Sequence, residues 1–593
     1  MHIKKINIQN IFSYEDATFH FEKYNVIVGA NNAGKTNFVR ILDMISKSSD
    51  LNYTELYRND KLNDSHSAQI SLTIELTNEE TKHIFQTITG QFINSMDFSK
   101  ELKIFDVIIY WGNIVQDVSH PNLILLKFHS GLTIIMQGSL NISFDYKLSF
   151  NSNDLFEEAI ENSKNMEHEE RIEYIRKKGT MRFDGQLGSS TIISKTMNKG
   201  SPIEDIFQRD GINFSTEFPL IVEQINDKQT LQSREVMDFI KMKKSPGSSQ
   251  SVRLSSFLSQ LFKMNYQSIE EIHPSILELV TNLVNLRDVY DSTYTELRTK
   301  FREITNGVEV KVGKMNPYGE PTKQEMITLT ENKKTYLLEN TASGYYALVH
   351  ILHLILEKPN QMIVIDEPEV HFHPIMISRL AKNFTDISES NNNQIIIISH
   401  SPRFVNYKLI DSRQPNVLTS IIKKDHKSLV HSTPRDFIPK LKPHLFDSDM
   451  FFGLSSLIVE GSDDYFAMKA ISDHFGGLFE KYDITLIHCW GVGNVFHKIE
   501  IHNAFKIPFV AMTDNEYAED QTNVIKLPID LEDEYEKLGW ERKSGQKVKD
   551  DAYPFMEWLL KQGDGLDKLK KSPIWTAFET IIKNTNGKMP ATI

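Results

Sequence analysis

The chain has 593 residues, of which 40% are apolar and 24% charged, and this composition is typical of a folded globular protein. Its formal net charge of −13 argues against a broadly basic coat for nucleic acid. Four short basic segments could still line a local groove or simply form solvated surface. They are residues 171–182, 241–244, 542–549 and 568–571.

Cysteine content and the length of apolar runs exclude several classes of protein. Cys489 is the only cysteine, so disulfides and thiolate zinc sites are excluded, and a metal would need oxygen or imidazole ligands. The amino terminus lacks the apolar core of a signal peptide, and no stretch of about 18 apolar residues could span a bilayer. We therefore expect a cytoplasmic protein without a membrane partner, built from roughly three to four domains.

The first part of the chain is predicted to be rich in strands. Apolar and polar residues alternate in its earliest segments, as they do in strands with one buried face, and later segments are more continuously apolar. The predicted strands are residues 3–10, 17–29, 68–77, 103–111, 123–128, 132–138 and 142–150. The second of these ends in an apolar run that reaches Gly29.

From about residue 153 the sequence becomes polar and helical, with a flexible break at residues 243–253. Apolar residues then recur at three- and four-residue steps over residues 274–301, which predicts one amphipathic helix. Its apolar stripe contains Ile276, Leu279, Val280, Leu283, Leu286, Tyr290 and Leu297. Such a stripe either packs on its own domain or pairs with a second helix at a dimer interface.

Strand patterns return in the second half of the chain, at residues 308–314, 326–330, 362–368 and 394–400. After residue 453, strands and helices alternate on short connections, which indicates a parallel sheet. The strands of this pattern are residues 454–461, 483–491 and 507–514, and the helices are residues 463–475 and 494–505.

Residues 29–36 fit the phosphate-loop pattern GxxxxGK[ST] at every position, between an apolar strand and a helical segment. The glycines let backbone N–H groups surround phosphate oxygens, Lys35 can neutralise the β- and γ-phosphates, and Thr36 can ligate Mg²⁺. We therefore predict an ATP site. Its binding residues are Gly29, Asn31, Asn32, Ala33, Gly34, Lys35, Thr36 and Asn37.

Further motifs suit the same nucleotide. Asp366 and Glu367 end an apolar strand, where the first carboxylate can hold Mg²⁺ and the second can polarise the attacking water. His400 follows another apolar strand and could contact the γ-phosphate. Ser343 and Gly344 begin a helix, where they would suit a phosphate presented by another subunit.

These motifs resemble those of ABC-type ATPases of the SMC-like branch. The resemblance implies that residues 343–348 stand for the signature motif, His400 for the switch histidine and Glu367 for the catalytic glutamate. It also implies a homodimer or higher homo-oligomer, because two heads complete each other's pockets. The usual leucine-serine-glycine-glycine run is absent, and no Q-loop glutamine is assigned. Residues 369–374 resemble a segment of OLD-type ATPases, although their two histidines could alternatively hold a metal.

Acidic residues also follow strands in the last part of the chain. Glu460 ends one apolar strand, Asp464 lies at the start of the next helix, and Asp514 and Glu516 follow a later strand. The carboxyl ends of parallel strands lie along one edge of a sheet, so these carboxylates can converge there. Close ionised carboxylates need a cation, and Mg²⁺ or Mn²⁺ prefers oxygen ligands. For Glu460 alone, a solvated cap of the next helix is the alternative.

This acidic pattern resembles the Toprim domain, in which a glutamate after the first strand and a DxD motif after a later strand bind catalytic metal. The glycine turn at residues 491–494 resembles it too, whereas Glu516 replaces the usual second aspartate. An SMC-like ATPase followed by Toprim resembles the OLD family of nucleases, which includes the nuclease subunit of Gabija antiphage systems. In that family a further acid and a lysine complete the site, for which Glu532 and Lys547 or Lys549 are the best matches.

The sequence thus predicts an α/β protein: an ABC-type ATPase head with a helical insertion, followed by a Toprim domain with a parallel sheet. Its predicted parts are the ATPase halves 1–152 and 306–430, the insertion 153–305, a linker 431–452 and the Toprim domain 453–593. The resemblance implies an ATP-regulated, metal-dependent DNA endonuclease in antiphage defence, acting with a second defence protein. A sensor or scaffold with an inactive Toprim domain and a ribonuclease acting on tRNA remain alternatives.

Overall fold

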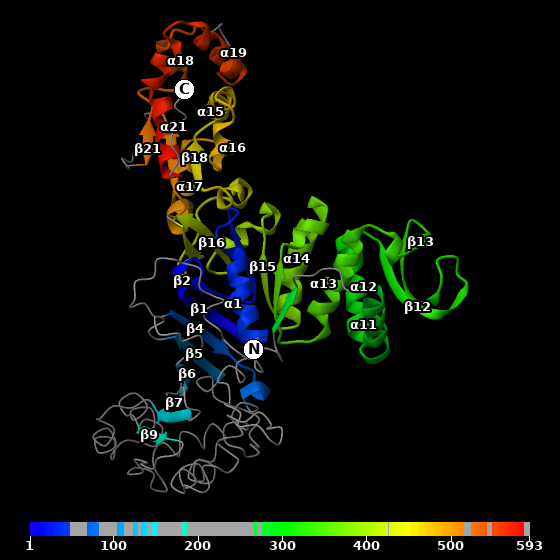
Figure 1. The fold of residues 1–593 in the computed structure, drawn as a ribbon. Coiled ribbons are helices and arrows are strands. Elements are labelled where there is room, and N and C mark those ends of the chain that lie inside the picture. The colour runs from blue at the N-terminus through cyan, green and yellow to red at the C-terminus, as the bar shows by residue number, and fades with distance from the viewer. Residues whose placement is uncertain are drawn as a thin grey trace. The chain divides into compact units, whose positions relative to one another are not determined.

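The computed structural model describes most of the chain outside a long central stretch (Figure 1). The described residues are 1–47, 68–81, 103–111, 123–128, 132–138, 144–150, 181–186, 266–269, 275–424, 426–514, 523–541 and 548–585. Contacts divide the chain into two units. The first comprises Met1–Lys23, Thr36–Asp366 and Asn383–Ile396, and the second comprises Tyr24–Lys35, Glu367–Lys382 and Ile397–Ile593. Each unit therefore draws on distant segments of sequence.

The first unit contains an antiparallel sheet, in which the described strands follow the order β2-β1-β4-β5-β6-β7-β8-β9. Side chains alternate between buried and half-buried along β4, as one covered face requires. The strands are β1 (His2–Ile11), β2 (Tyr14–His20), β4 (Ala68–Glu75), β5 (Ile104–Trp111), β6 (Leu123–Phe128), β7 (Leu132–Gly138), β8 (Phe144–Phe150) and β9 (Met181–Gln186). The sequence predicted strands at all of these except β9, which lies in the stretch expected to be helical. The single strand predicted at residues 17–29 is instead two strands, β2 and β3 (Tyr24–Gly29), in different sheets.

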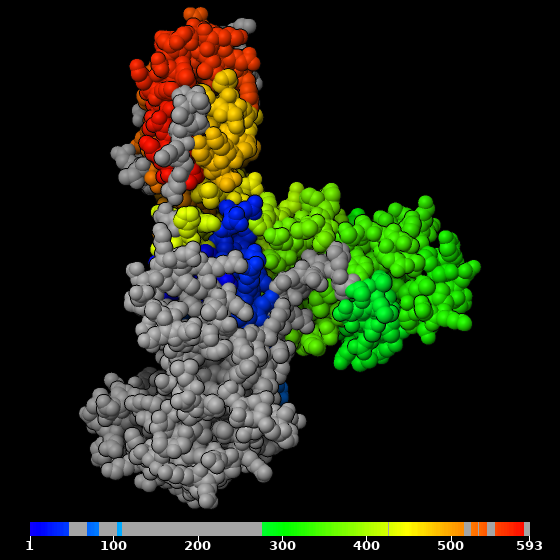
Figure 2. Space-filling model, in the orientation of Figure 1, coloured from blue at the N-terminus to red at the C-terminus, as the bar shows by residue number. Residues whose placement is uncertain are grey.

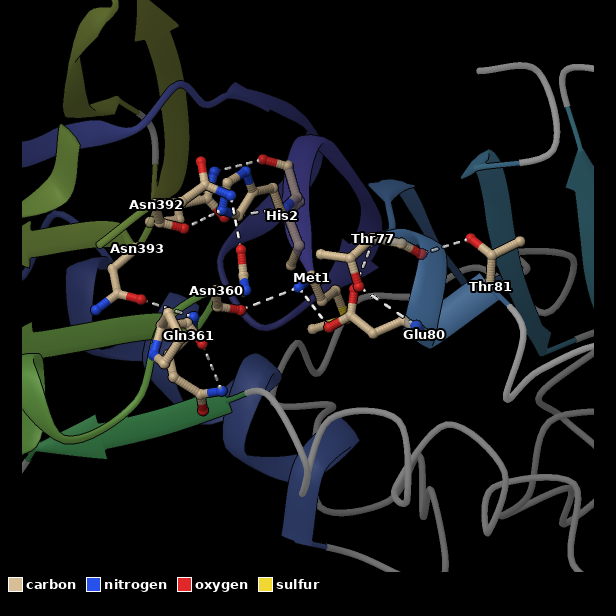
Figure 3. Close-up of polar contacts among 12 residues, drawn as sticks. Met1, His2, Thr77, Glu80, Thr81, Asn360, Gln361, Asn392 and Asn393 are labelled. Carbon is tan, nitrogen blue, oxygen red and sulfur yellow. Dashed lines mark hydrogen bonds and ion pairs between the residues drawn. The ribbon is translucent and has the colours of Figure 1, made fainter. Parts of the chain in front are cut away.

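Polar contacts fix Met1 and β1 to the segment before β14 (Met362–Asp366) and to the first residue of β15 (Gln394–Ile398), as Figure 3 shows in part. The amino group of Met1 contacts the Glu80 carboxylate at 2.6 Å and donates to the Asn360 carbonyl oxygen at 3.0 Å. The Gln394 side chain accepts from the Ile3 N–H at 2.9 Å and donates to its carbonyl at 2.7 Å. These buried bonds anchor the segment that leads into β14.

The amphipathic run predicted as one helix forms two helices, α11 (Ile276–Val289) and α12 (Asp291–Thr305). The prediction of a single helix was wrong because Tyr290 leaves helical geometry, with φ −128° and ψ 57°, and its side chain is exposed. Asp291 then begins α12, where a negative charge is favourable. Apolar periodicity reports which face is buried, and it does not detect one non-helical residue.

The middle of the apolar stripe is buried within the first unit, at Leu279, Leu283 and Leu286 of α11 and at Leu297 of α12, whereas Tyr290 is exposed. Tyr294 of α12 accepts a hydrogen bond from the Val312 N–H at 2.9 Å, and α12 packs on α13 (Ser343–Glu357). Val312 lies in a three-stranded sheet formed by β11 (Glu309–Met315), β12 (Pro321–Glu331) and β13 (Lys334–Leu337). The space-filling view shows this region as a continuous green surface (Figure 2). A dimer contact through these helices stays a prediction.

Parallel strands carry the predicted nucleotide motifs. In the first unit, β10 (Tyr266–Ile269) pairs in parallel with β14. In the second unit, β3 (Tyr24–Gly29) pairs in parallel with β16 (Asn416–Lys424), which is joined by a hairpin to β17 (Lys427–Ser432). β3 and the first four residues of β14 are buried, as expected of strands covered on both faces. β10 was not predicted and also lies in the stretch expected to be helical.

The end of the second unit contains a parallel sheet in the order β19-β18-β20-β21, drawn yellow to orange in Figure 1. Its strands are β18 (Ser455–Val459), β19 (Ile484–His488), β20 (Phe509–Thr513) and β21 (Val524–Lys526). Its helices are α15 (Ser462–His474), α16 (Leu478–Lys481), α17 (Val492–Ala504), α18 (Leu531–Lys537), α19 (Val548–Lys561), α20 (Gly565–Lys570) and α21 (Pro573–Asn584). The predicted parallel sheet is confirmed. Within the described residues, no helix is long and apolar enough to cross a membrane.

Candidate functional site

The predicted phosphate loop joins the buried end of β3 to α1 (Lys35–Lys47). Gly29 has φ +153°, and a Cβ added there would lie 2.2 Å from the Ile421 carbonyl oxygen on β16. Gly34 and Asn32 also have positive φ, at 115° and 60°. Such a backbone can turn its N–H groups inward around an anion, and β16 approaches so closely that only glycine fits at position 29.

The Lys35 side chain is buried within this loop. Its ammonium donates to the Gly29 carbonyl oxygen at 2.7 Å and to the Ala30 carbonyl oxygen at 3.0 Å. A buried ammonium among backbone dipoles favours a negatively charged ligand, so the loop fits a nucleotide phosphate. The neighbouring predicted residues vary in exposure: Ala33 is buried, Asn31, Asn32 and Thr36 are exposed, and Asn37 donates to Ser13 at 3.1 Å.

Asp366 is the last residue of β14, and Glu367 follows it in the left-handed backbone region, with φ 47°. The Glu367 N–H donates to the Ile398 carbonyl at 2.9 Å, which holds this turn against the end of β15. A non-glycine residue in this conformation is strained by about 1–2 kcal/mol, and the surrounding bonds must offset that strain. The turn leaves the Glu367 carboxylate half-exposed, in the position expected of a base that contacts water.

His400 lies beside Glu367 in the second unit. Its Nε2 is 3.2 Å from a carboxylate oxygen of Glu367. Burial lowers the pKa of His400, and the Lys35 ammonium lowers it further, although Glu367 and Glu369 act in the opposite direction. The imidazole is therefore neutral at pH 7 and can both donate and accept hydrogen bonds. The structure thus brings together Lys35, Glu367 and His400, as the sequence motifs predicted.

Glu369 holds the backbone at His400, a role that the sequence did not reveal. Its carboxylate accepts a short hydrogen bond from the His400 N–H. Glu369 lies in the segment 369–374, which resembles OLD-type ATPases and for which a metal site was the alternative. His373 contributes to the start of α14 (Pro374–Ser390), where the Ile375 N–H lies 3.4 Å from its Nδ1. Among the described residues, no three His, Cys, Asp or Glu side chains form a group suited to a metal.

Ser343 and Gly344 begin α13, as the sequence predicted for a helix start. Ser343 is exposed and Gly344 is buried. The Ala342 N-cap supplies no side-chain hydrogen bond to the helix. This helix start leaves N–H groups without an intrahelical acceptor, which suits an anion. Their contact with a nucleotide on a second subunit stays a prediction.

The C-terminal sheet brings two of the predicted acids together. Glu460 directly follows β18 and Asp514 directly follows β20, and these strands pair in parallel with Val459 opposite Met512. A carboxylate oxygen of Glu460 accepts from the Asp514 N–H at 3.5 Å. The two oxygen-bearing side chains therefore share one edge of the sheet, and their donor set fits Mg²⁺ or Mn²⁺.

The other predicted acids differ in their placement. Asp464 is buried, and its carboxylate accepts from the Gly461 N–H at 2.8 Å at the start of α15. It therefore serves at least as a cap for that helix. Glu516 and Lys547 lie outside the described residues. Glu532 falls in α18 and Lys549 in α19, but their side chains are outside the described part of the structure.

A family model described as an AAA ATPase domain matches residues 1–405, more than half of the chain. The chain belongs to this family. A second model, described as an overcoming lysogenization defect protein-like TOPRIM domain, matches residues 451–515, which contain Glu460 and Asp514. The predicted order of an ATPase domain followed by a Toprim domain is thus confirmed. Such domains in general use a nucleotide and a divalent metal.

Curated relatives match parts of this AAA ATPase chain. The OLD nuclease of Thermus scotoductus is 22% identical over 161 residues, which cover 26% of this chain and 30% of that protein. The Old nuclease of Escherichia phage P2 is 25% identical over 173 residues, which cover 27% of this chain and 28% of that protein. Protein ea59 of Escherichia phage lambda is 32% identical over 73 residues, which cover 12% of this chain and 14% of that protein. The chain spans less than a third of the length of each relative.

SMC head domains are among the similar solved structures. The SMC head domain from Thermotoga maritima aligns with a TM-score of 0.32 and 11% identity, over 72% of this chain and 98% of that one. The Smc head domain with a coiled coil and joint from Pyrococcus yayanosii has a TM-score of 0.32 and 12% identity, over 73% of this chain and 98% of that one.

Proposed function

We propose that this protein is an ATP-regulated, divalent-metal-dependent DNA endonuclease. The observation that carries the proposal is the contact between the Glu460 carboxylate and the Asp514 N–H at the edge of the TOPRIM sheet. Paired acids at this edge suit a metal that acts on phosphodiesters. The OLD nucleases with which the chain aligns support the reaction class.

The nucleotide half of the proposal assigns roles to described residues. Lys35 binds the β- and γ-phosphates, Glu367 polarises the attacking water, and neutral His400 orients the γ-phosphate and the Glu367 carboxylate. Thr36 and Asp366 would hold Mg²⁺ through their side-chain oxygens, and the ion would neutralise charge on the phosphates. Ser343 and Gly344 complete the pocket of a second copy, so ATP binding and dimerisation are linked.

The cutting half of the proposal depends on the acids of the TOPRIM domain. Glu460 and Asp514, with Asp464 and Glu516 in the predicted set, would hold Mg²⁺ or Mn²⁺, which when bound activates water and stabilises the leaving oxygen. Glu532 and Lys549 complete the proposed set, and a lysine there offsets charge that develops on the phosphate. β18 and β20 hold Glu460 and Asp514 in fixed register.

A second candidate function is a sensor or scaffold that acts through a partner protein. The observation that favours it is the Asp464 carboxylate, which caps α15 through the Gly461 N–H. A carboxylate engaged in this way is a weaker metal ligand than one directed at the sheet edge. In this case ATP binding would change the affinity for the partner, and neither DNA nor RNA would be cut.

One assay separates these functions. Purified protein is incubated with supercoiled plasmid and, separately, with tRNA, in Mg²⁺ or Mn²⁺ and with or without ATP. The proposal predicts plasmid cleavage that Glu460→Gln abolishes, because the substitution removes the charge while keeping the side-chain size. Glu480→Gln is the matched control, since Glu480 is paired with Lys469 on the protein surface. Cleavage retained in Glu460→Gln would disprove the metal-site assignment.

The comparison of plasmid with tRNA decides between the remaining candidate functions. Cleavage of tRNA without cleavage of plasmid would replace DNA with RNA as the substrate. Failure to cut either one, with normal ATP turnover, would support the scaffold. The antiphage role is tested in cells by plating efficiency of a phage panel, with Glu460→Gln as the inactive comparison and with neighbouring genes co-expressed as candidate second proteins.

A further inference from the structure

Trp490 is an exposed indole in the connection after β19. Its side chain has 70% of its surface accessible, whereas Trp575 is 2% exposed and Trp540 and Trp558 pack against each other. An indole offers a large apolar face, and leaving it in water forgoes the stabilisation that burial would give. A flat ligand that covers the indole would bury this face and recover that stabilisation.

The backbone fixes Trp490 next to the TOPRIM acids. On one side of it, the Cys489 N–H donates to the Val459 carbonyl at 3.0 Å, and on the other the Gly491 N–H donates to the Glu460 carbonyl at 3.0 Å. Trp490 itself has φ 61°, in the left-handed region that bulky residues rarely adopt. The turn therefore holds the Trp490 backbone next to that of Glu460 at a cost in backbone strain, and strain of this kind tends to occur at functional sites.

A row of aromatic rings leads away from the indole. The His488 ring lies 4.3 Å from the Trp490 ring, measured between centroids, and Tyr465 continues the row at 6.3 Å from His488. Phe466 follows, at 5.7 Å from Tyr465. Burial lowers the pKa of His488, so this ring is neutral at pH 7 and packs as an aromatic rather than as a cation. The indole therefore packs against at least one neighbouring ring.

Space is open around the turn that follows. A Cβ added at Gly491 or at Gly493 would meet no atom within 4 Å. No described side chain therefore covers the backbone at these two glycines, and a ligand can approach it there. The exposed indole, its neighbouring ring and this open turn adjoin the residue that the proposed function places in the metal site.

We propose that Trp490 is a stacking platform for an unpaired nucleobase of a DNA strand bound at the TOPRIM acids. This proposal rests on the proposed nuclease function for its class of ligand. Stacking accepts any base, because every base has a flat π-face, so the platform favours single-stranded or locally opened DNA without reading its sequence. A fully paired duplex shields its bases and gains nothing from the indole.

The test measures binding separately from cutting. Full-length protein in EDTA is titrated into fluorescein-labelled oligothymidylate and into a closed duplex without unpaired bases. Trp490→Ala is expected to weaken oligothymidylate binding by about tenfold or more, and Trp490→Phe to retain most of it. Duplex binding and ATP turnover should not change. Tyr318→Ala is the matched control, because Tyr318 is an 89% exposed aromatic in the turn before β12.

Two further measurements keep the outcome decisive. Trp490→Gly removes the indole and also relieves the strain of the left-handed backbone. It therefore replaces Trp490→Ala in the binding test if the alanine variant folds poorly. Oligonucleotides with one abasic position, moved stepwise along the strand, should include one that wild type binds as weakly as Trp490→Ala binds the intact strand. With that oligonucleotide, the substitution should have no further effect.

The outcomes distinguish this proposal from the one on which it rests. Unchanged oligothymidylate binding by both Trp490→Ala and Trp490→Gly overturns the platform, while cleavage lost in Glu460→Gln still upholds the nuclease. Loss of cleavage without loss of binding also overturns it, because Trp490 would then act on the acids. If wild type neither binds nor cuts any DNA, the nuclease proposal fails and the platform fails with it.

Discussion

Gly29→Ala should damage the nucleotide loop through sterics alone, without removing a polar group. The new Cβ would lie 2.2 Å from the Ile421 carbonyl oxygen and 3.1 Å from its carbon, and both atoms belong to the backbone of β16. Gly29 and Ile421 are paired in register, so relief requires β3 and β16 to separate. Strain at φ +153° is about 1–3 kcal/mol, and a lost ladder hydrogen bond adds about 1 kcal/mol.

We therefore expect Gly29→Ala to lose about 2–4 kcal/mol of unfolding free energy, which for an ATPase domain of this length corresponds to a fall in melting temperature of roughly 2–5 °C. Thermal unfolding is recorded with and without Mg²⁺-ATP. ATP should raise the melting temperature of wild type and raise that of the variant much less. Gly313→Ala is the matched control, since Gly313 lies in a strand and a Cβ there meets no atom within 4 Å. Equal melting temperatures and equal ATP shifts for Gly29→Ala and wild type would refute the assignment of this loop.

Three further substitutions test other parts of the site and its support. Glu367→Gln should slow phosphate release from ATP by about 10²- to 10⁴-fold while nucleotide binding persists; a full rate would exclude Glu367 as the base. Burial lowers the pKa of His502 to about 4, so its contribution to stability is complete above pH 6.5 and is lost as pH falls towards 4, by about 3 kcal/mol. Urea unfolding at pH 7 and pH 4.5 should show that His502→Gln loses less stability between these pH values than wild type. An identical loss in both proteins would show that His502 is not the source of this pH dependence. Asp464→Ala should destabilise the TOPRIM domain by about 1 kcal/mol through loss of its bond to the Gly461 N–H, and Asp464→Asn should destabilise it less. Equal unfolding midpoints for both variants and wild type would show that the cap contributes little.

The sequence predicted the strand ends of the site because their apolar runs are unambiguous. β3 ends at Gly29 and β14 at Asp366, while Glu460 and Asp514 directly follow β18 and β20. Parallel strands bring their carboxyl ends to one edge, so the contact between Glu460 and Asp514 followed from the same argument. The spacing of Lys35 within its motif also fixed its place in the loop.

Features that depend on one backbone angle or one tertiary contact escaped prediction. Tyr290 interrupts an apolar stripe that continues on both sides of it. β10 has a weak strand pattern and is a strand because it pairs with β14, so tertiary context overrides local preference. The bond from the His400 N–H to Glu369 joins residues far apart in sequence. For Asp464, the same position suits a metal ligand and a helix cap, and sequence alone does not separate the two.

The most direct test of the central claim compares initial rates of plasmid nicking with and without ATP, for wild type and for Lys35→Ala. Lys35 is the buried cation of the phosphate loop, and removing it should abolish the response to nucleotide while Glu460 and Asp514 stay in place. We expect ATP to change the nicking rate of wild type and to leave that of Lys35→Ala unchanged. Equal rates with and without ATP in both proteins would contradict nucleotide control of the TOPRIM site.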